Sequence, residues 1–475
     1  MNQIHLKTLA FLALLASLFS FSCGPNKQNG PEIGLSLIPP TQITNLVNLD
    51  IRAGLKNKSA NATTVEVTLY LNAEKPENII HQAKLELAAH AADFVKFSMP
   101  TKDKVGMNKI ILKVKGDGFE ARKEKEVEIV ASTVRSNKKI GGAWISFYHW
   151  SEEEGKMWNP ALKKMTDEQW KELVRSMHEL GMDIIVIQES FRNQEYVGKH
   201  NMDRTGYTGK AFYPSKLFPA RMPIAAKDPI EAVLSEADQL GMHVMMGVGM
   251  YAWFDYTPGS LAWHKKVAQE LYEMYGQHNS FYGFYVSEEG MGSLDCFETE
   301  PAKQEARRQE VLNFFKSFRP FVKQLAPDKP VMFAPNGWGV GRAGNAYYEL
   351  LKNVDMISPF AFNRMPEGDL TGKAAIDLLQ KYCDETQTHL WLDLEAFLFK
   401  EKEGYLYPRP MSEIKYELDH YDNFERVICY QYPGVFSNPK ASIQVGENST
   451  IKLFQSYQKY VDSLSRKSGN RQVQK

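Results

Sequence analysis

Two short apolar stretches of the sequence end in carboxylates, which could act as a pair of acidic groups in a reaction. The stretch Phe281–Gly290 is apolar for most of its length and then gives Glu288 and Glu289 in succession. A second stretch, 389–397, has the same form, with Glu395 near its end. Runs that are apolar on both parities are typical of parallel strands covered on both faces, so the charges are expected where the strands emerge.

Two such carboxyl groups in one pocket could cleave a glycosidic bond. That reaction needs a proton on the leaving oxygen and a negative charge beneath the cationic sugar carbon, so one carboxyl group must be neutral while the other is ionised. In retaining enzymes the two groups stand about 5–5.5 Å apart, and in inverting enzymes about 6.5–9.5 Å apart.

The elements that would position these residues alternate between strands and helices from residue 139 to residue 466. Strands are predicted at 142–147, 183–188, 243–248, 281–287, 331–334, 355–359, 390–394 and 427–431. Helices lie between them, and two have clear starts: a capping box at Thr166 and Gln169, and an Asp228–Pro229 pair. Eight strand and helix pairs predict a (β/α)8 TIM barrel, whose chemistry lies at the carboxyl ends of the strands.

Other residues that follow these strands fit a sugar pocket. Amides, a guanidinium and carboxylates bind hydroxyl groups, and indole rings cover the apolar face of a pyranose. The candidates are His149 and Trp150 after the first strand, Gln188 and Glu189 after the second, Tyr251 and Trp253 after the third, Asn336 and Trp338 after the fifth, Asn363 and Arg364 after the sixth, and Tyr432 after the eighth.

Several of these candidates also have a purely structural interpretation. Glu189 could cap a helix or pair with Arg192, His149 could be a hydrogen-bonded loop histidine, and Arg364 could hold a loop through an ion pair. Asp393 lies two residues before Glu395 and shares its strand parity, but deeper in the barrel, where a supporting role is expected.

The barrel with carboxylates after its fourth and seventh strands resembles the retaining glycoside hydrolases of clan A. The resemblance implies that Glu289 is the acid/base and Glu395 the nucleophile. In that clan an Asn usually precedes the acid/base, and here that position is Glu288, which leaves the choice between Glu288 and Glu289 open. Both domains also resemble a family of bacterial lipoproteins that are classed as glycoside hydrolases of unknown function.

The region before the barrel alternates between apolar and polar residues. Strands of period two are predicted at 47–53, 64–71, 83–87, 93–97, 108–114 and 125–130. Six or seven short strands in about a hundred residues indicate an antiparallel, immunoglobulin-like β-sandwich. The predicted domains are therefore a sandwich at 35–134 and a barrel at 139–466, followed by a tail at 467–475.

The amino-terminal residues predict export. Lys7 precedes an apolar core too short to span a bilayer, and small residues lead to Cys23. The segment 1–22 resembles a bacterial lipoprotein signal, which implies lipidation of Cys23, a tether at 23–34 and anchoring to the cell envelope in the periplasm or outer membrane. Ser20 stands where the usual motif has Leu, so secretion without a lipid remains open.

Composition excludes some classes of function. Lys and Arg together number 57, as do Asp and Glu, so the net charge does not favour nucleic acid as a partner. The scattered histidines and the cysteines 296, 383 and 429 show no metal-binding spacing, so no metal or cofactor is predicted. Cys383 and Cys429 are expected to be buried thiols.

The predicted partner is a carbohydrate, and the predicted function is glycoside hydrolysis, with two alternatives. One is a glycan-binding lipoprotein on a degenerate barrel, which would tolerate loss of either carboxylate. The other is a sugar lyase or isomerase that uses Glu189, Glu289 and His149 around a metal ion.

Overall fold

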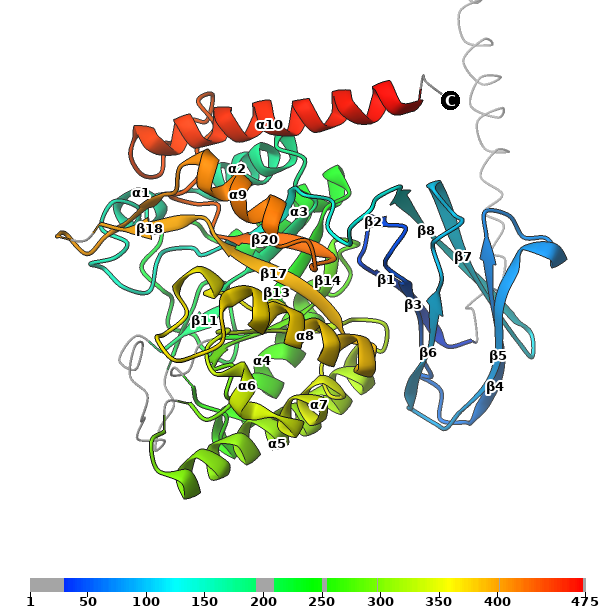
Figure 1. Ribbon diagram of the computed structural model, residues 1–475. Coiled ribbons are helices and arrows are strands. Elements are labelled where there is room, and N and C mark those ends of the chain that lie inside the picture. The colour runs from blue at the N-terminus through cyan, green and yellow to red at the C-terminus, as the bar shows by residue number, and fades with distance from the viewer. Residues whose placement is uncertain (1–29, 194–208, 250–253, 297, 401, 473–475) are drawn as a thin grey trace, which may run out of the picture.

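The protein consists of a sheet-rich amino-terminal part and a larger barrel, which lie side by side (Figure 1). The computed structural model describes residues 30–193, 209–249, 254–296, 298–400 and 402–472, with only the backbone described for 465–472. The predicted signal segment, Cys23, Tyr251 and Trp253 lie outside the described residues.

The barrel is closed, and all eight of its strands are parallel. In chain order they are β9 (Ile140–Ile145), β10 (Ile184–Ile187), β13 (His243–Gly247), β14 (Phe281–Gly290), β15 (Val331–Pro335), β16 (Met356–Ile357), β17 (His389–Glu395) and β20 (Arg426–Tyr430). Each strand pairs with its neighbours in the chain, and β20 closes the ring on β9. The predicted eight-stranded parallel barrel is thus confirmed.

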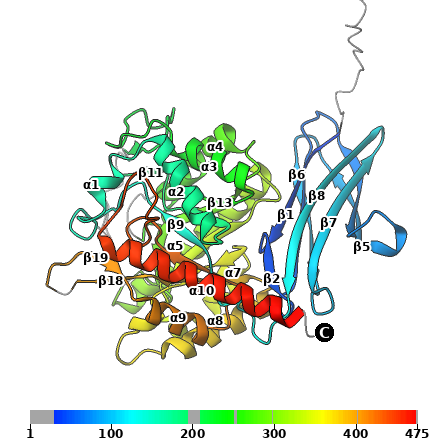
Figure 2. The ribbon, with the colours of Figure 1, turned by 90° about the horizontal axis from the view of Figure 1, so that it is seen from above.

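Helices separate the strands and cover the outside of the barrel (Figures 1 and 2). They are α1 (Asn159–Leu162), α2 (Asp167–Glu179), α3 (Pro229–Leu240), α4 (Pro258–Tyr275), α5 (Pro301–Leu325), α6 (Val340–Ala343), α7 (Asn345–Leu351), α8 (Gly372–Thr386), α9 (Met411–His420) and α10 (Asn448–Gln472), with a 3-10 turn η2 (Phe362–Arg364). The capping box at Thr166 opens α2, and Asp228 caps α3 ahead of Pro229. α10 continues into the predicted tail.

Two short hairpins are added beyond the barrel strands. β11 (Phe191–Arg192) pairs with β12 (Lys210–Ala211) after β10, and β18 (Phe397–Phe399) pairs with β19 (Leu406–Pro408) after β17. Both follow the carboxyl ends of barrel strands, so they extend the rim where loops of such barrels carry function.

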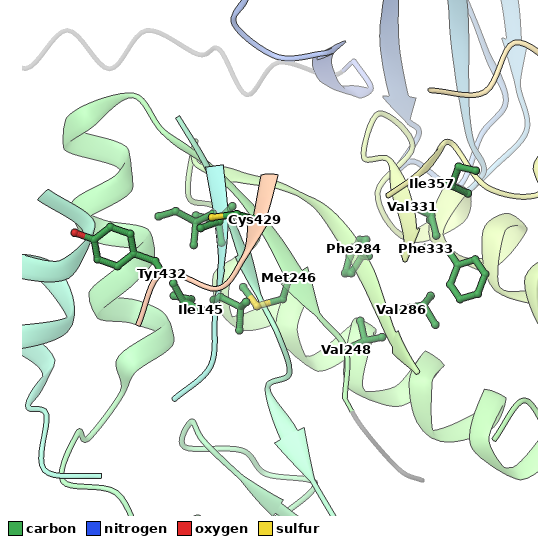
Figure 3. Packing of buried hydrophobic residues seen from close by; sticks show 14 of the residues in the cluster. Ile145, Met246, Val248, Phe284, Val286, Val331, Phe333, Ile357, Cys429 and Tyr432 are labelled. Atoms are coloured by element: carbon green, nitrogen blue, oxygen red, sulfur yellow. The ribbon is translucent and has the colours of Figure 1, made fainter. Parts of the chain in front are cut away.

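The apolar side chains of the barrel form two separate cores. The larger core lies between the strands and the helices and includes Val248, Phe284, Val286 and Phe333 (Figure 3). The smaller core fills the inside of the barrel with side chains such as Trp144, Met245, Tyr285 and Trp391. A strand buried on both faces explains why β14 and β17 are apolar on both parities.

The amino-terminal part contains two sheets around one apolar core. β1 (Glu32–Ile38), β3 (Leu49–Lys56) and β6 (Ala92–Met99) form one sheet, and β2 (Gln42–Thr44), β8 (Phe119–Val130), β7 (Gly106–Gly116), β4 (Thr63–Leu71) and β5 (Ile79–Leu87) form the other. A 3-10 turn, η1 (Pro76–Asn78), precedes β5. The wholly antiparallel prediction was wrong at one edge, because β2 pairs with β8 in parallel. The immunoglobulin-like topology stays a prediction.

The amino-terminal part closes the bottom of the barrel, at the amino ends of its strands. Ile38 is the last residue of β1 and is fully buried in the barrel's inner core. Tyr282 at the start of β14 donates a hydrogen bond to the carbonyl oxygen of Leu37 (2.7 Å). The inner core is therefore completed by a residue from outside the barrel.

Buried charges cross the same interface. Arg52 on β3 contacts Asp50 (2.8 Å) and Asp355 (2.6 Å), the residue just before β16. His389, at the start of β17, contacts Glu425 (2.6 Å) and Asp50 (3.4 Å). Each of these five side chains is less than one-tenth exposed, so the pairing replaces the water that the charges lose.

The three described cysteines, Cys296, Cys383 and Cys429, are buried thiols. Cys383 lies in α8 and Cys429 in β20, as predicted. Within the described residues, no helix has the length and apolar content needed to cross a membrane.

Candidate active site

A pocket of about 330 Å³ opens at the carboxyl ends of the barrel strands. Side chains from all eight strands or from the loops after them line it, together with the β18–β19 hairpin. They are Trp144, His149, Trp150, Glu154, Gln188, Phe254, Tyr285, Ser287, Glu289, Ala334, Asn336, Trp338, Phe360, Arg364, Asp393, Glu395, Phe397, Phe399, Leu406 and Tyr430. Eight of the predicted site residues thus meet in one place.

Strand parity decides which carboxylate of β14 reaches this pocket. Tyr285, Ser287 and Glu289 line it, whereas Phe284 and Val286 belong to the outer core (Figure 3). Alternation carries Glu288 to the outer side with them, where it is fully buried and does not line the pocket. Its carbonyl oxygen accepts a hydrogen bond from Tyr256 (3.0 Å). Glu289 is the carboxylate that this strand presents to a ligand.

The surroundings of Glu289 favour its neutral form. Burial raises the pKa of its carboxyl group to about 7, against the positive charge of Arg364, which lowers it, and with the negative charge of Glu395, which raises it further. A hydrogen bond with the side chain of Asn336 opposes the increase. Near neutral pH this group can therefore exist as a carboxylic acid and give up a proton.

Glu395 has the opposite surroundings. It ends β17, and Arg364 in the turn η2 donates hydrogen bonds to it from Nε (3.0 Å to Oε1 and 3.2 Å to Oε2) and Nη2 (2.7 Å to Oε1). The guanidinium also lies over the ring of Trp338, 5.1 Å from its centre. Charge-assisted hydrogen bonds of this kind stabilise an ionised carboxylate and fix its orientation.

Asp393 lies on the same strand, one step deeper than Glu395. Its side chain is 6% exposed and lines the pocket, while Leu392 and Leu394 on the other parity pack in the outer core. Burial raises the pKa of Asp393 well above its ordinary value, and the charges of Glu395 and Glu289 add to this. The sequence suggested a supporting role because of the depth of Asp393, but it is part of the pocket wall.

His149 and Glu154 form another wall of the pocket. His149 is buried, and its Nε2 lies 3.6 Å from Oε2 of Glu154. Burial lowers the pKa of His149 to about 4, so the ring is neutral at pH 7. Burial also raises the pKa of Glu154 to about 7, with a contribution from Glu153. The ring of Trp150 lies beside that of His149, with 5.5 Å between their centres.

Besides Glu288, three predicted candidates lie away from the pocket. Glu189 is buried and pairs with Arg192, which was its structural interpretation. Asn363 donates to Glu417 and accepts a hydrogen bond from Tyr421 (2.7 Å). Tyr432 packs in the outer core (Figure 3), where its ring stacks on that of Phe436.

Some pocket residues had no place among the sequence candidates. Tyr285 and Ser287 were within reach, since they precede Glu289 by four and two residues on one strand face. Phe397, Phe399 and Leu406 come from the β18–β19 hairpin, whose pairing leaves no strong signal in the sequence. Glu154 lies in the loop between β9 and α1, where no periodicity marks it.

The arrangement around His149 does not form a metal centre. Glu189 lies outside the pocket, and within the described ranges no group of three or more His, Cys, Asp or Glu side chains is placed to hold a metal ion. The ligand set proposed for a metal-dependent lyase or isomerase is thus not assembled.

A comparison with family models assigns the barrel to a protein family. The model described as "Domain of unknown function (DUF4434)" matches residues 140–443, which is more than half of the chain. The chain belongs to this family. The DUF4434 match runs from β9 to beyond β20, so every described residue that lines the pocket falls within it. No curated protein matches the chain.

Three solved structures similar to the chain all carry the names of glycosidases. A candidate alpha-L-fucosidase from Bacteroides thetaiotaomicron is 17% identical, with a TM-score of 0.48, and the match covers 70% of this chain and 96% of that one. A beta-glucuronidase from Bacteroides uniformis is 14% identical, with a TM-score of 0.40, over 90% of this chain and 50% of that one. A beta-galacturonidase from Eisenbergiella tayi is 12% identical, with a TM-score of 0.39, over 88% and 69%. The chain thus spans about half the length of the glucuronidase.

Proposed function

We propose that this protein is a glycoside hydrolase of the retaining type, with Glu289 as acid/base and Glu395 as nucleophile. The observation that carries the proposal is the contrast between these two carboxyl groups, which line one pocket at the ends of the fourth and seventh barrel strands. Burial raises the pKa of Glu289 to about 7, and Arg364 binds Glu395 through both of its carboxylate oxygens. One acid and one anion are what glycosidic cleavage requires.

In the first step a carboxylate oxygen of Glu395 attacks the anomeric carbon. The bond from that carbon to the glycosidic oxygen breaks, and the oxygen takes the proton of Glu289 as it leaves. In the second step water attacks the same carbon, Glu289 takes a proton from that water, and the bond to Glu395 breaks. The free sugar and both original carboxyl groups result, so the cycle is balanced.

The two carboxyl groups are coupled in a way that suits both steps. The negative charge of Glu395 raises the pKa of Glu289, which favours the acid form before the first step. An ester at Glu395 carries no charge, so the pKa of Glu289 falls while the intermediate exists. Glu289 then becomes the base that the second step needs.

The retaining version rests on strand position. Carboxylates after the fourth and seventh strands are the arrangement of the clan A enzymes that the sequence resembles, and those enzymes form a glycosyl ester. The carbohydrate partner follows from the chemistry and from the aromatic walls of Trp150 and Trp338, since indoles pack against sugar rings. Export and lipidation of Cys23 complete the proposal, as the sequence predicts.

The test is a screen of α- and β-aryl glycosides and of polysaccharides, with the wild type and with Glu289→Gln and Glu395→Gln. Loss of a general acid should reduce turnover about 10²- to 10⁴-fold, and loss of the nucleophile should abolish it. Glu288→Gln separates the two adjacent carboxylates, and Glu305→Gln on the exposed face of α5 is the matched control. Full turnover in Glu289→Gln or Glu395→Gln would remove that residue from the mechanism.

Two further measurements distinguish the roles. Glu289→Gln should still release dinitrophenol from an activated glycoside, because such a leaving group needs no proton. A 2-deoxy-2-fluoro glycosyl fluoride should leave a sugar on the peptide that contains Glu395, detected by its mass. Turnover that persists in a chelator would separate hydrolysis from metal-dependent lyase or isomerase chemistry, and glycan binding unaffected by either Gln variant, with no turnover, would identify a binding protein.

A further inference from the structure

Three polar atoms of the pocket walls lack a hydrogen-bond partner within the part of the chain that the structure describes. They are Oδ1 of Asp393, Oε1 of Gln188 and Nε1 of Trp338. Buried polar atoms are almost always hydrogen-bonded, because an unpaired one costs about 1–3 kcal/mol. Two acceptors and a donor on residues that line one pocket are therefore suited to a ligand that carries hydroxyl groups.

Of these three residues, Asp393 has the position that best indicates which part of a ligand it would contact. It is nine-tenths buried and lies on β17 between Trp391, which fills the inside of the barrel, and Glu395 at the strand end. A group that reaches Asp393 must therefore enter past Glu395. With a sugar carbon held at Glu395, a ring substituent of that same sugar is the part that can extend to the floor of the pocket.

We propose that Asp393 binds a hydroxyl group of the sugar whose bond is cleaved, and that the pocket therefore selects uncharged glycosides over glycosides that carry a carboxylate or sulfate. This inference rests on the proposed function, since it names the class of substrate for the same site.

The protonation of Asp393 supports this role. Burial raises its pKa well above the ordinary value, the charges of Glu395 and Glu289 add to the increase, and a backbone hydrogen bond from Tyr430 only partly opposes it. The side chain is then a neutral carboxylic acid, which has one O–H donor together with acceptor oxygens. A sugar hydroxyl group, itself both donor and acceptor, is its natural partner.

The other ionisable side chains of the pocket offer little to an anion. Glu154, Glu289 and Glu395 line the same walls as Asp393, and none of these acidic groups can supply a positive charge. Arg364 is the cation among the described lining residues, and its Nε and Nη2 are already bonded to Glu395. His149 is neutral at pH 7, because burial lowers its pKa to about 4. A carboxylate on the sugar would lose water and gain no such partner, which is costly in a buried site.

The first experiment compares aryl glycosides that differ only at C6. Glucoside is paired with glucuronide and galactoside with galacturonide, in both anomeric forms, and kcat/KM is measured for each. The neutral member of each hydrolysed pair should be preferred about 100-fold or more, since an unpaired charge in the site is penalised. A uronide hydrolysed as fast as, or faster than, its neutral partner would overturn the proposal.

The second experiment identifies the hydroxyl group of the sugar that Asp393 contacts. Monodeoxy versions of the best substrate are tested with the wild type, Asp393→Ala and Asp393→Asn. For one deoxy sugar, kcat/KM should fall about 10- to 100-fold with the wild type but little with Asp393→Ala. The effects of removing the two partners of one contact are not additive, because the first removal already abolishes the contact. Asp393→Asn keeps a donor and an acceptor and should stay within about tenfold of the wild type. Equal losses in wild type and Asp393→Ala for every deoxy sugar would reduce Asp393 to a structural residue.

Two controls keep the result interpretable. Asp384→Asn, on the exposed end of α8, is the matched substitution outside the pocket, and Asp393→Ser replaces the Ala variant if that variant does not fold. If no glycoside is hydrolysed, the proposed function fails, and calorimetry with methyl glycosides and methyl uronides then decides this inference by itself. The inference is supported if the methyl glycoside binds and its binding weakens in Asp393→Ala. It is overturned if the methyl uronide binds more tightly than the methyl glycoside, or if neither binds.

Discussion

The guanidinium of Arg364 binds both carboxylate oxygens of Glu395, with Nε 3.0 Å from Oε1 and 3.2 Å from Oε2. Glu395 is the less exposed partner, at 12% against 43% for Arg364. The arginine therefore reaches in from the rim to a carboxylate that is mostly withdrawn from water. The pair belongs to two elements, the turn after β16 and the end of β17, and fixes how they meet.

Arg364→Lys should lower kcat/KM even though the positive charge remains. A lysine cannot reproduce the planar two-oxygen contact, and a charge-assisted hydrogen bond of this kind contributes about 1.5–3 kcal/mol. The expected loss is therefore about 10- to 100-fold, measured with the best aryl glycoside. Arg221 does not line the pocket and donates a hydrogen bond to the carbonyl oxygen of Phe212 (2.8 Å), so Arg221→Lys controls for the substitution itself. Unaltered kcat/KM in Arg364→Lys would show that the contact does not serve catalysis.

The pH dependence of kcat/KM should report the acid form of Glu289. Activity should fall as the pH rises through about 7, because burial raises the pKa of this carboxyl group to about that value and the ionised form has no proton to give. In Glu289→Gln, assayed with a dinitrophenyl glycoside, this alkaline limb should be absent. A limb that persists unchanged there would assign it to another group.

Arg364→Met should move the same alkaline limb to higher pH. The positive charge of Arg364 lowers the pKa of Glu289, so its removal raises that pKa and keeps the acid form to higher pH. Arg364→Lys keeps the charge and should leave the limb near its original position. A shift to lower pH in Arg364→Met would contradict the assignment of Glu289.

The sequence predicted the barrel and the positions of Glu289 and Glu395 because both depend on short-range patterns. A strand apolar on both parities that ends in a charge is readable without any partner. Alternation along β14 and β17 would also have pointed to Tyr285 and to Asp393 as pocket residues. What the chain order could not predict is the partner that Arg364 finds on another element, Glu395. The pairing of Glu189 with Arg192 was one of the two interpretations that the sequence left open, and only the structure decided for it.

Arg52→Met should destabilise the whole protein. Arg52 is fully buried between Asp50 and Asp355, and its removal takes the main cation from Asp50 and leaves Asp355 with Arg319 alone. Breaking a buried pair in this way costs about 3–5 kcal/mol in the free energy of unfolding, measured by urea denaturation. Arg122→Met, which removes two ion pairs on the exposed face of β8, should leave the free energy of unfolding nearly unchanged.

His389 should make stability depend on pH. Its contacts with Glu425 and Asp50 outweigh burial and raise its pKa from 6.5 to about 9. A group whose pKa is raised by folding stabilises the protein fully below pH 6.5 and loses that contribution as the pH rises through about 9. The difference in unfolding free energy between wild type and His389→Gln should therefore shrink over this window. A difference that is constant from pH 6 to 10 would exclude the protonated histidine.

Ile38→Ala should cost about 2–5 kcal/mol of stability, the range for truncating a buried isoleucine. Ile38 is fully buried in the inner core of the barrel, although it belongs to β1. Val105→Ala, at a position that is 55% exposed, should change stability by no more than about 0.5 kcal/mol. Similar small effects in both variants would mean that the inner core does not depend on β1.

The burial of Ile38 in the barrel also determines the smallest part of the protein that can usefully be expressed alone. A gene trimmed to start at residue 140, where the family match begins, would encode the barrel without β1. At the amino ends of the barrel strands, the inner-core residues Trp391, Tyr282 and Met356 would then be exposed to water. Such a fragment should aggregate through this exposed apolar surface. The part of the chain that must fold together is therefore larger than the residues that the family model matches.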